Sequence, residues 1–222
     1  MLHIKNLTFA YPKSDFSLCI DELQVSKGEK IAVIGPSGSG KTTLLNLIAG
    51  IIIPVKGSIQ LNGTKIEKLD DTGRRALRIS SIGFVFQDFK LIGYLSILEN
   101  LLLPFRINPA LTLDRAKQAE ATSLALTFGI SKNLKKYPSQ LSHGERQRVA
   151  ICRALITKPS LILADEPTGN LDPKNKLLIL DILLQYVNQQ NATLVTVTHD
   201  YELINRFDRV VDFQQFILSN ER

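Results

Sequence analysis

The sequence is poor in cysteine and has no long apolar run. Its two cysteines, Cys19 and Cys152, lie far apart in apolar segments, so we expect buried thiols rather than a disulfide bond or a metal site. No uninterrupted apolar run reaches the roughly 18 residues that suggest a membrane-spanning helix. The segment Met1–Lys5 also lacks the apolar core of a signal peptide. We therefore expect a cytoplasmic protein.

Long-period repeats, low-complexity tracts and coiled-coil heptads are also missing from the sequence. A hydrophobic content of 44% and a charged content of 22% describe an ordinary soluble globular protein of 222 residues. This length fits one domain, with or without an inserted subdomain. The net charge of +6 is compatible with attraction to nucleotide phosphates, anionic lipids or nucleic acid, and it does not choose among them.

The strongest motif is a glycine-rich segment that fits the phosphate-binding pattern G-x-x-x-x-G-K-[ST], Gly35-Pro36-Ser37-Gly38-Ser39-Gly40-Lys41-Thr42. A β-branched apolar run at 30–34 precedes it, and an apolar helical stretch at 43–50 follows it. The context therefore predicts a strand, a loop and a helix. A glycine-rich surface turn is the alternative, and these flanking elements disfavour it.

The chemistry of phosphate binding explains the residue types in this loop. Glycines let consecutive backbone N–H groups turn toward phosphate oxygens, and the following helix N-terminus adds partial positive charge. We expect Lys41 to meet the β- and γ-phosphates and the hydroxyl of Thr42 to suit Mg²⁺. The expected nucleotide-binding residues here are Gly35, Pro36, Ser37, Gly38, Ser39, Gly40, Lys41, Thr42 and Thr43.

Short apolar runs around the phosphate loop predict further strands. Residues 2–11 and 16–20 alternate in part, and 57–63 runs into an Asn-Gly turn, so we expect a small antiparallel sheet. Residues 79–86 predict another strand, which Gln87 follows. A lone glutamine in a loop more often bonds to backbone than takes part in chemistry. Tyr11 could stack on a base or fill the core, and the residues alone leave these two alternatives about even.

The sequence becomes helix-rich from residue 88 onward, which indicates an inserted helical subdomain. The apolar run at 95–103 predicts a helix that Pro104 stops, and 114–128 has helical spacing. Residues 141–155 predict a further helix, because Ser142 and Glu145 form a capping box ahead of an apolar stripe. With Ser142 and Gly144 at its mouth, the N-terminus of this helix also suits an anion.

Two later predicted strands end in polar residues. The run at 161–164 predicts a buried strand, and Asp165 and Glu166 follow it. Adjacent carboxylates at such a place are costly unless a cation uses them. In a phosphate-loop protein the Asp is the expected Mg²⁺ partner, and the Glu can position or deprotonate a water. The run at 193–198 predicts a strand that precedes His199.

Ligands in open α/β sheets bind outside the carboxyl ends of the strands. The predicted strands that close at Ile34, Phe86, Ala164 and Thr198 are followed by the phosphate loop, Gln87, the two carboxylates and His199. This convergence favours functional roles for Gln87 and His199 over purely structural ones.

On these motifs, nearly the whole chain resembles the nucleotide-binding subunit of an ABC ATPase. Residues 141–145, Leu-Ser-His-Gly-Glu, match the family's LSGGQ signature, and Asp165-Glu166 ends its Walker B strand. Gln87 resembles the Q-loop glutamine, His199 the switch histidine, and Gly169-Asn170-Leu171-Asp172 the D-loop. Tyr11 falls where the family stacks an aromatic ring on adenine.

The resemblance implies an α/β fold of the P-loop NTPase (RecA-like) type. Its core has a mainly parallel sheet, an N-terminal antiparallel β subdomain and an inserted α-helical subdomain. It further implies one ABC ATPase domain over 1–222, in which 1–87 and 158–222 form the nucleotide-binding core. Residues from about 88 to 157 would form the helical subdomain with the signature motif.

It also implies a head-to-tail pair of ATPase subunits, most simply two copies of this chain, with two ATP molecules between them. Each nucleotide would lie between the phosphate loop of one copy and Ser142, Gly144 and Glu145 of the other. Glu166 would act as the base, His199 would contact the γ-phosphate, and Gln87 would sense Mg²⁺. The expected catalytic set is Lys41, Gln87, Glu166 and His199, and the expected magnesium set is Thr42, Gln87 and Asp165.

The signature departs from the family pattern at two positions. Glu145 in place of Gln keeps the capping-box chemistry and occurs in the family. His143 in place of Gly puts a side chain beside a phosphate-facing turn. If this side chain points away, it changes little. If it faces the nucleotide, its gain of charge at mildly acidic pH makes activity pH-sensitive.

Residues 145–151, 164–172 and 99–104 look similar to one branch of the family. That branch includes lipoprotein-releasing, macrolide-exporting and cell-division ATPases, whose ATP cycle drives mechanical work through a separate membrane protein. We therefore expect a membrane-spanning, permease-type subunit on another chain, docked near residues 87–106, and a location on the inner face of the cell membrane. Such a mechanotransmission-type exporter is the first hypothesis for function.

Two other functions remain as hypotheses. One is a regulator without transport, in which the same motor moves a membrane partner to control an envelope or cell-division complex. The other is a soluble ABC-type ATPase that acts on DNA or ribosomes. The sequence disfavours the latter, because it has no long coiled-coil insertion, zinc cysteines or duplicated ATPase domain. No nucleic-acid partner is expected. The residues do not specify the transported substrate or the direction of work.

Overall fold

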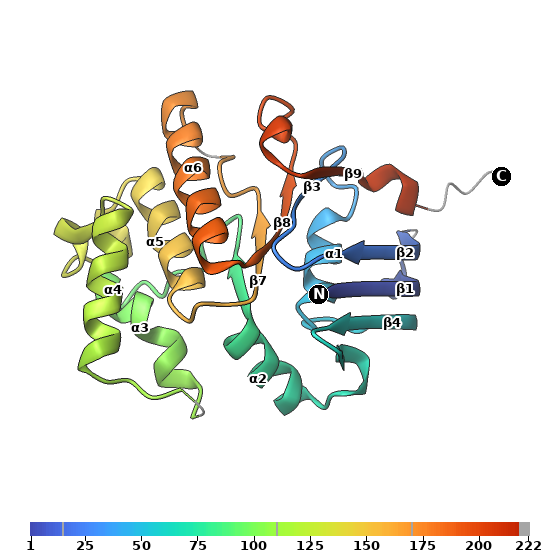
Figure 1. Cartoon of the computed structure of the whole chain (residues 1–222), viewed down its shortest axis with the longest axis horizontal. Coiled ribbons are helices and arrows are strands. Elements are labelled where there is room, and N and C mark those ends of the chain that lie inside the picture. The colour runs from blue at the N-terminus through green and yellow to red at the C-terminus, as the bar shows by residue number, and fades with distance from the viewer. Residues whose placement is uncertain (15, 110, 170, 218–222) are drawn as a thin grey trace.

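Two β-sheets and a set of helices beside them make up the fold. A computed structural model describes residues 1–14, 16–109, 111–169 and 171–217. The antiparallel sheet lies at one end of the molecule, and the helices α3, α4 and α5 gather at the other (Figure 1). The parallel sheet runs between these two ends, where its strands β3, β7 and β8 are visible.

The antiparallel sheet has the strand order β2-β1-β4-β5. Its strands are β1 (Leu2–Ala10), β2 (Ser17–Val25), β4 (Lys56–Leu61) and β5 (Thr64–Lys65). Asn62 and Gly63 connect β4 to β5 with φ angles of 49° and 85°, which suit the tight turn of a two-residue hairpin. The predicted antiparallel sheet and its Asn-Gly turn are therefore confirmed.

The other sheet is parallel and has the order β6-β7-β8-β3-β9. Its strands are β3 (Lys30–Ile34), β6 (Ile82–Val85), β7 (Leu161–Asp165), β8 (Thr193–Thr198) and β9 (Arg209–Asp212). All residues of β7 and β8 are buried, as is usual for the central strands of a parallel sheet, although β8 includes Thr193, Thr196 and Thr198. Because neighbouring strands are parallel, the residues that follow β3, β6, β7 and β8 emerge at one edge.

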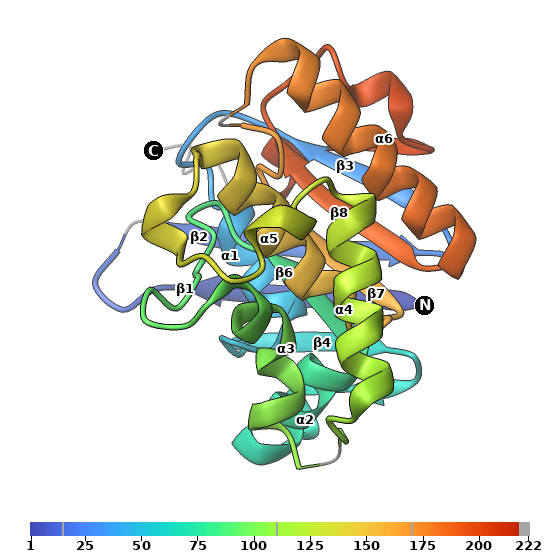
Figure 2. The ribbon, with the colours of Figure 1, turned by 90° about the vertical axis from the view of Figure 1, so that its left-hand side faces the viewer.

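Six α-helices occur in the described residues. They are α1 (Lys41–Ile48), α2 (Asp71–Ser81), α3 (Ile97–Ile107), α4 (Arg115–Thr127), α5 (His143–Leu155) and α6 (Pro173–Gln190). Turned by 90°, the molecule shows α3, α4 and α5 side by side (Figure 2). Contacts of α5 with α3, α4 and α6 confirm this arrangement. None of the helices in the described residues is long and apolar enough to cross a membrane.

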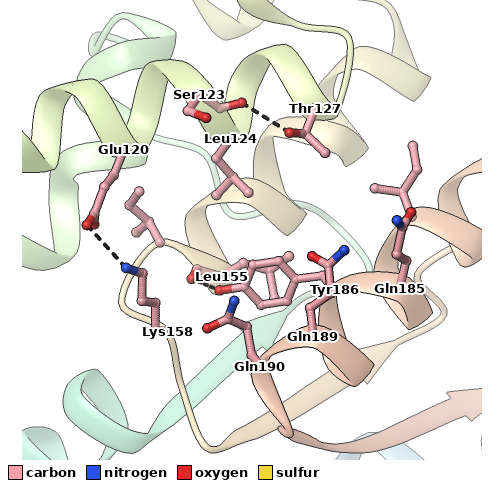
Figure 3. Close-up of a pocket in the computed structure, with 12 residues that line it drawn as sticks. Glu120, Ser123, Leu124, Thr127, Leu155, Lys158, Gln185, Tyr186, Gln189 and Gln190 are labelled. Carbon is pink, nitrogen blue, oxygen red and sulfur yellow. Dashed lines mark hydrogen bonds and ion pairs between the residues drawn. The ribbon is translucent and has the colours of Figure 1, made fainter.

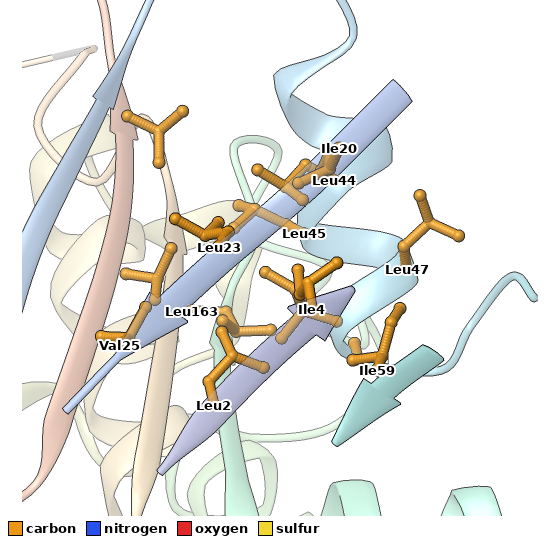
Figure 4. Close-up of a cluster of buried hydrophobic side chains, with 14 of the residues drawn as sticks. Leu2, Ile4, Ile20, Leu23, Val25, Leu44, Leu45, Leu47, Ile59 and Leu163 are labelled. Carbon is orange, nitrogen blue, oxygen red and sulfur yellow. The ribbon is translucent and has the colours of Figure 1, made fainter. Parts of the chain in front are cut away.

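Helix α1 packs between the two sheets. Leu44, Leu45 and Leu47 of α1 belong to one buried cluster with Leu2 and Ile4 of β1, Ile20, Leu23 and Val25 of β2, Ile59 of β4, and Leu163 of β7 (Figure 4). Burial of this apolar surface, at about 25 cal/mol per Å², holds the antiparallel sheet against the phosphate-loop helix. The loop that precedes α1 is therefore fixed from both sides.

The two faces of the parallel sheet take part in different clusters. On β7, Leu161 and Leu163 join the cluster with α1, whereas Ile162 and Ala164 join a second cluster with α3, α4, α5 and α6. This alternation follows from the two-residue period of a strand. Helix α1 of the expected core thus packs on one face of the sheet, and the inserted helices pack on the other. The division at residues 88 and 157 stays a prediction.

Some predicted boundaries are wrong. Residues 79–81 belong to helix α2, not to the following strand, because Asp70 caps that helix at Gly73 N and Arg78 donates to the carbonyls of Ala49 and Gly50. The strand β6 therefore starts at Ile82, and it ends at Val85, one residue before the predicted end. Strand β7 includes Asp165, one residue beyond the predicted end.

Pro104 does not stop the helix that contains it. Helix α3 starts after the capping box of Ser96 and Glu99 and continues through Pro104 to Ile107. The missing N–H of a proline inside a helix costs about 3 kcal/mol. Burial of Phe105 beyond the proline, with Leu101 and Leu102 before it, offsets that cost. The other predicted helices, 43–50, 114–128 and 141–155, are confirmed with shifts of one or two residues at their ends.

Candidate functional site

The phosphate loop connects β3 to α1, as its flanking residues predict. Gly38 and Gly40 have φ angles of 74° and 105°, which favour glycine. A Cβ atom at Gly40 would lie 2.3 Å from the ring of Phe16, so this position also has no room for a side chain. Lys41 Nζ donates to the carbonyl oxygens of Gly35 (2.9 Å) and Pro36 (2.6 Å). The Lys41 side chain therefore lies back along the phosphate loop.

The loop opens into a cavity of about 450 Å³ at the carboxyl edge of the parallel sheet. Residues from four separate segments line it: Ser37, Gly38, Gly40, Lys41, Thr42, Gln87, Asp165, Glu166, Val197 and His199. Apart from Val197, these are residues that the sequence marks as candidates. The structure therefore brings together the expected catalytic set of Lys41, Gln87, Glu166 and His199 and the expected magnesium set.

The pair Thr42 and Asp165 links the start of α1 to the end of β7. Thr42 Oγ1 donates to Asp165 Oδ2 at 2.8 Å. Burial raises the pKa of Asp165, although the Thr42 hydrogen bond and the charge of Lys41 oppose that rise. Burial also lowers the pKa of Lys41, against the attraction of Glu166 and Asp165. A buried carboxylate with an elevated pKa is a group whose charge a cation would stabilise.

The donor set of this cavity fits Mg²⁺. Thr42, Asp165 and Gln87 present hydroxyl, carboxylate and amide oxygens, and oxygen is the ligand atom that Mg²⁺ prefers. No group of three or more His, Cys, Asp and Glu side chains in the described residues could hold a metal ion. Phosphate oxygens and water would therefore complete the coordination shell, as is common for this ion.

Glu166 and His199 form the second pair in the cavity. His199 Nδ1 lies 2.7 Å from Glu166 Oε1. Glu166 N donates to the carbonyl of Val197 at 3.0 Å, and the φ of Glu166 is 48°. A left-handed conformation is uncommon for a residue with a side chain, and strained residues of this kind cluster at functional sites. The Glu166 side chain is 11% exposed, whereas that of His199 is 63% exposed.

One ion pair next to His199 is not predicted from the sequence. Lys176 Nζ of α6 donates to Asp200 Oδ2 at 2.8 Å, and this hydrogen bond holds the pKa of Asp200 below its usual value. The pair fixes the backbone that carries His199 to the first turns of α6. Lys176 gives no signal in the sequence, because a lysine in a helix is ordinarily a solvated residue.

The signature residues lie at the N-terminus of α5. Glu145 N donates to Ser142 Oγ at 3.2 Å, and Ser142 N donates to Glu145 Oε2 at 2.8 Å, so the predicted capping box is confirmed. Asn133 Nδ2 donates to Glu145 Oε1 at 2.7 Å. The hydrogen bond from the Ser142 backbone, followed by that from Asn133, lowers the pKa of Glu145. Both carboxylate oxygens of Glu145 are thus used within the chain.

Ser142, Gly144 and Glu145 are not among the described residues that line the cavity of the same chain. Gly144 lies beside Leu171, whose Cδ2 would be 3.1 Å from a Cβ atom at this position. His143 points its ring at Phe89, with ring centroids 5.3 Å apart in an edge-to-face arrangement. The side chain that departs from the family pattern therefore contacts the segment after Gln87.

The remaining candidates among the described residues do not line the cavity. Tyr11 is 39% exposed, its ring meets Phe9 edge-on at 4.8 Å, and its hydroxyl lies 3.1 Å from Thr43 Oγ1. Stacking of Tyr11 on adenine stays a prediction. Gly35, Pro36, Ser39 and Thr43 belong to the loop and its helix but not to the cavity lining. In the expected D-loop, Asp172 caps α6, whereas Asn170 lies outside the described residues.

A second hollow of about 390 Å³ lies between α4, the end of α5, and α6 (Figure 3). Two of its polar contacts are the ion pair of Lys158 with Glu120 at 3.2 Å and the hydrogen bond that the Tyr186 hydroxyl donates to the carbonyl of Leu155 at 2.8 Å. Burial raises the pKa of Tyr186 to about 12, so the phenol stays protonated. We therefore place no reaction in this hollow.

Comparison with known proteins identifies the family of the chain. The model of the ABC transporter family matches residues 20–169. The lipoprotein-releasing system ATP-binding protein LolD 1 of Rhodopirellula baltica is 43% identical over 211 residues, which cover 94% of this chain and 91% of the relative. The corresponding LolD protein of Hydrogenovibrio crunogenus is 43% identical over 202 residues, or 90% of this chain and 87% of the relative.

Solved structures agree with the sequence relatives. A dimeric structure of MJ0796, a bacterial ABC transporter cassette, has a TM-score of 0.88 and 34% identity, and the match covers 96% of this chain and 95% of that chain. A dimeric post-hydrolysis state of the same cassette bound to ADP and Pi has a TM-score of 0.85 at the same identity and coverage. The expected fold class and the resemblance to the ABC ATPase family are thus confirmed. The chain belongs to the ABC transporter family and is an ATP-binding, ATP-hydrolysing subunit of it.

Proposed function

We propose that the chain works as a pair of ATPase subunits that power a separate membrane protein of the lipoprotein-releasing type. The observation that carries this proposal is the division of the site. Lys41, Asp165, Glu166 and His199 share one cavity, whereas Ser142 and Gly144 lie outside the lining of that cavity. A second copy, turned head to tail, would supply the missing signature residues. The relatives named as lipoprotein-releasing system ATP-binding proteins support the proposed type of membrane partner.

In the proposed reaction, the phosphate loop and Lys41 bind the phosphates of ATP. The backbone N–H groups at the start of α1 and the lysine ammonium compensate negative charge from one side. The N-terminus of α5 from the second copy, with Ser142 and Gly144, compensates it from the other side. Closure of the pair therefore depends on the intact triphosphate, and the pair opens again after hydrolysis and loss of phosphate.

Glu166 is the proposed base for the attacking water, because its carboxylate reaches the cavity and is held in place by His199. Nδ1 of His199 is paired with Glu166 Oε1, and Nε2 would contact the γ-phosphate. Thr42, Asp165 and Gln87 would hold Mg²⁺, which neutralises charge on the phosphate oxygens. These roles explain why two carboxylates and a histidine meet beside a phosphate loop.

The proposed contact with the membrane subunit is a groove beside Gln87. A hollow of about 250 Å³ is lined mostly by apolar side chains from α2, β6, α3 and α5, among them Phe84, Phe86, Leu103, Pro104 and Ile107. We propose that a short cytoplasmic helix of the membrane-spanning subunit occupies it. The groove overlaps the segment 87–106 at Lys90, Leu103 and Pro104. Docking there would place this chain at the cytoplasmic face of the inner membrane.

Substitution of Ile107 by glutamate tests the groove. Ile107 is 58% exposed, so Ile107→Glu leaves the fold intact and puts a charge into the apolar surface. We expect the variant to keep its own ATPase activity and to lose co-purification with the membrane subunit in mild detergent. Leu126→Glu is the matched control, because Leu126 is 69% exposed on α4 and is not among the residues that line the groove. Equal recovery of the membrane subunit with both variants would contradict the proposed groove.

The identity of the recovered partner separates the other hypotheses. A membrane-spanning partner whose complex moves lipoproteins supports the proposed function. A partner that controls an envelope enzyme, without transport, supports the regulatory alternative instead. Recovery of nucleic acid in a salt-dependent manner would contradict both, since phosphate contacts weaken steeply as salt rises.

A further inference from the structure

The segment after Gln87 has an unusual backbone. Phe89 N donates to the carbonyl of Phe86 at 3.1 Å, which closes a turn around Gln87 and Asp88. Lys90 N then donates to the carbonyl of Asp88 at 2.7 Å, a γ-turn centred on Phe89. Phe89 and Lys90 have φ angles of 62° and 48°. Two consecutive left-handed residues other than glycine are strained and need support from the surrounding structure.

Arg153 supplies that support from helix α5. Its guanidinium donates through Nη2 to the carbonyl of Phe89 at 2.6 Å and through Nη1 to the carbonyl of Lys90 at 2.5 Å. The two strained residues are thus the two that Arg153 holds. Its planar fork can bond two adjacent carbonyl oxygens at once, and a lysine ammonium lacks this geometry.

The charge of Arg153 has no acidic partner in the described residues. The ion pairs of those residues join other groups, and the Arg153 side chain donates to the two carbonyls. Burial alone lowers the pKa of Arg153 to about 10, so the side chain still carries its charge at neutral pH. Partial burial of a charge without a carboxylate partner costs free energy. The two hydrogen bonds to carbonyl oxygens offset part of that cost, so they are structural contacts of this arginine.

The side chain of Phe89 is held by the other end of the same helix. It is 7% exposed, with the His143 ring edge-on at 5.3 Å and the Arg146 guanidinium 5.9 Å from its centroid. Helix α5 therefore holds the Phe89 ring near its N-terminus and the Phe89 backbone near its C-terminus. The N-terminus of α5 carries Ser142 and Gly144, the residues proposed to meet the nucleotide of the other copy.

We propose that Arg153 is a positioning residue for ATP hydrolysis, which acts by holding the backbone of Phe89 and Lys90 and so placing Gln87 at the cavity. This inference rests on the proposed role of Gln87 at the Mg²⁺ site. The turn around Gln87 is closed by Phe89 N, so release of the two carbonyls frees that turn. Gln87 then no longer keeps a fixed place relative to Asp165 and to the signature helix.

A double-mutant cycle of Arg153→Met and Gln87→Ala in the full chain tests this inference. Methionine keeps much of the apolar stem and removes both hydrogen bonds. We expect each single variant to lower kcat about tenfold, and the double variant to be no slower than Gln87→Ala alone, because both changes disrupt one element. We also expect each to raise the Mg²⁺ concentration for half-maximal rate, with the affinity for ATP measured without Mg²⁺ unchanged.

A purely structural role of Arg153 predicts a different result. It would lower the rate of the double variant about a hundredfold, the product of the two single effects, and leave the Mg²⁺ dependence unchanged. That result would overturn the inference while the role of Gln87 stands. If instead Gln87→Ala alone hydrolyses ATP like the parent at every Mg²⁺ concentration, the proposed role of Gln87 fails first, and the inference fails with it.

Two further variants control for folding. Arg206 pairs with Asp181 of α6 and, among the described residues, does not contact the Gln87 segment. We therefore expect Arg206→Met to show parental kinetics. Arg153→Lys keeps the charge but loses the two-pronged contact, so we expect it to fold like the parent, to hydrolyse ATP more slowly and to need more Mg²⁺. Should Arg153→Met fail to fold, Arg153→Lys decides the question. A parental Mg²⁺ dependence in Arg153→Lys would then overturn the inference, and a raised Mg²⁺ requirement supports it.

Discussion

His199 Nδ1 lies 2.7 Å from Glu166 Oε1, and this contact joins the residues that follow two neighbouring strands, β7 and β8. The carboxylate is nearly buried and its backbone is in a left-handed conformation, so Glu166 has little freedom to turn away. The histidine, by contrast, is mostly exposed. A fixed carboxylate beside a more accessible ring is the arrangement from which the proposed base chemistry follows.

Lys41→Ala should weaken ATP binding itself. The lysine ammonium lies in the phosphate-loop cavity, and its charge acts on the bound nucleotide before any reaction occurs. We expect the affinity for ATP, measured by equilibrium binding, to fall by about tenfold or more, since one charge-assisted contact contributes about 1.5–3 kcal/mol. Lys27→Ala, at an exposed position, is the control. Equal affinities of the two variants would remove Lys41 from its assigned role.

Asp165→Asn should stabilise the protein in the absence of nucleotide and impair its function. Burial disfavours the charge of this carboxylate, and an amide oxygen can still accept the hydrogen bond of Thr42. We expect the Tm of the variant to rise in buffer with a chelator, because an amide needs no charge in this buried place. The same variant should lose the Mg²⁺ dependence of ATP binding. A lower Tm would contradict the account of this residue.

The stabilisation should also depend on pH. The pKa of Asp165 is raised in the folded protein, so the folded state keeps a proton that the unfolded chain releases just above the ordinary pKa of about 4. The free energy of unfolding therefore falls as pH rises through that window. We expect Asp165→Asn to gain more in Tm over the parent at pH about 7 than at pH about 4. A difference in Tm that stays constant with pH would refute this explanation.

His143→Gly should affect stability more than it affects the pH dependence of hydrolysis. In the structure the ring packs on Phe89 of its own chain, and an aromatic pair of this kind contributes about 0.5–1.5 kcal/mol. We expect a lower Tm and a pH–rate profile of unchanged shape. A profile that changes in mildly acidic buffer would show instead that the imidazole faces the nucleotide of the paired subunit.

The sequence predicts most of the cavity because its residues follow strong local patterns. The phosphate loop, Asp165, Glu166 and His199 each come after a buried strand, and parallel strands deliver such residues to one edge. Gln87 is the weakest of these candidates by its residue type alone, and only the convergence of strand ends favours a functional role for it. The capping box of Ser142 and Glu145 is also predictable, because its two residues lie three positions apart in the sequence.

Other features depend on contacts that no local pattern reveals. Helix α2 has no buried residue, and its end is fixed by Arg78 bonding to carbonyls at the end of α1, so its last turn resembled a strand in sequence. Pro104 lies inside α3 because of packing beyond it. Arg153 is one of three arginines in α5, and only the structure distinguishes the one that reaches the Gln87 segment. Edge strand β9 is likewise short and only partly buried.

Glu166→Gln provides the most direct measurement of the central claim, that ATP closes a pair of subunits and Glu166 then activates the water. Glutamine keeps the size of the side chain and removes its ability to take a proton. ATP hydrolysis by the full chain should fall by about 10²-fold or more while ATP binding persists. In sizing experiments the variant should accumulate as a dimer with ATP and return to the monomer without it. Hydrolysis at the parental rate, or a variant that stays monomeric with ATP, would contradict the account.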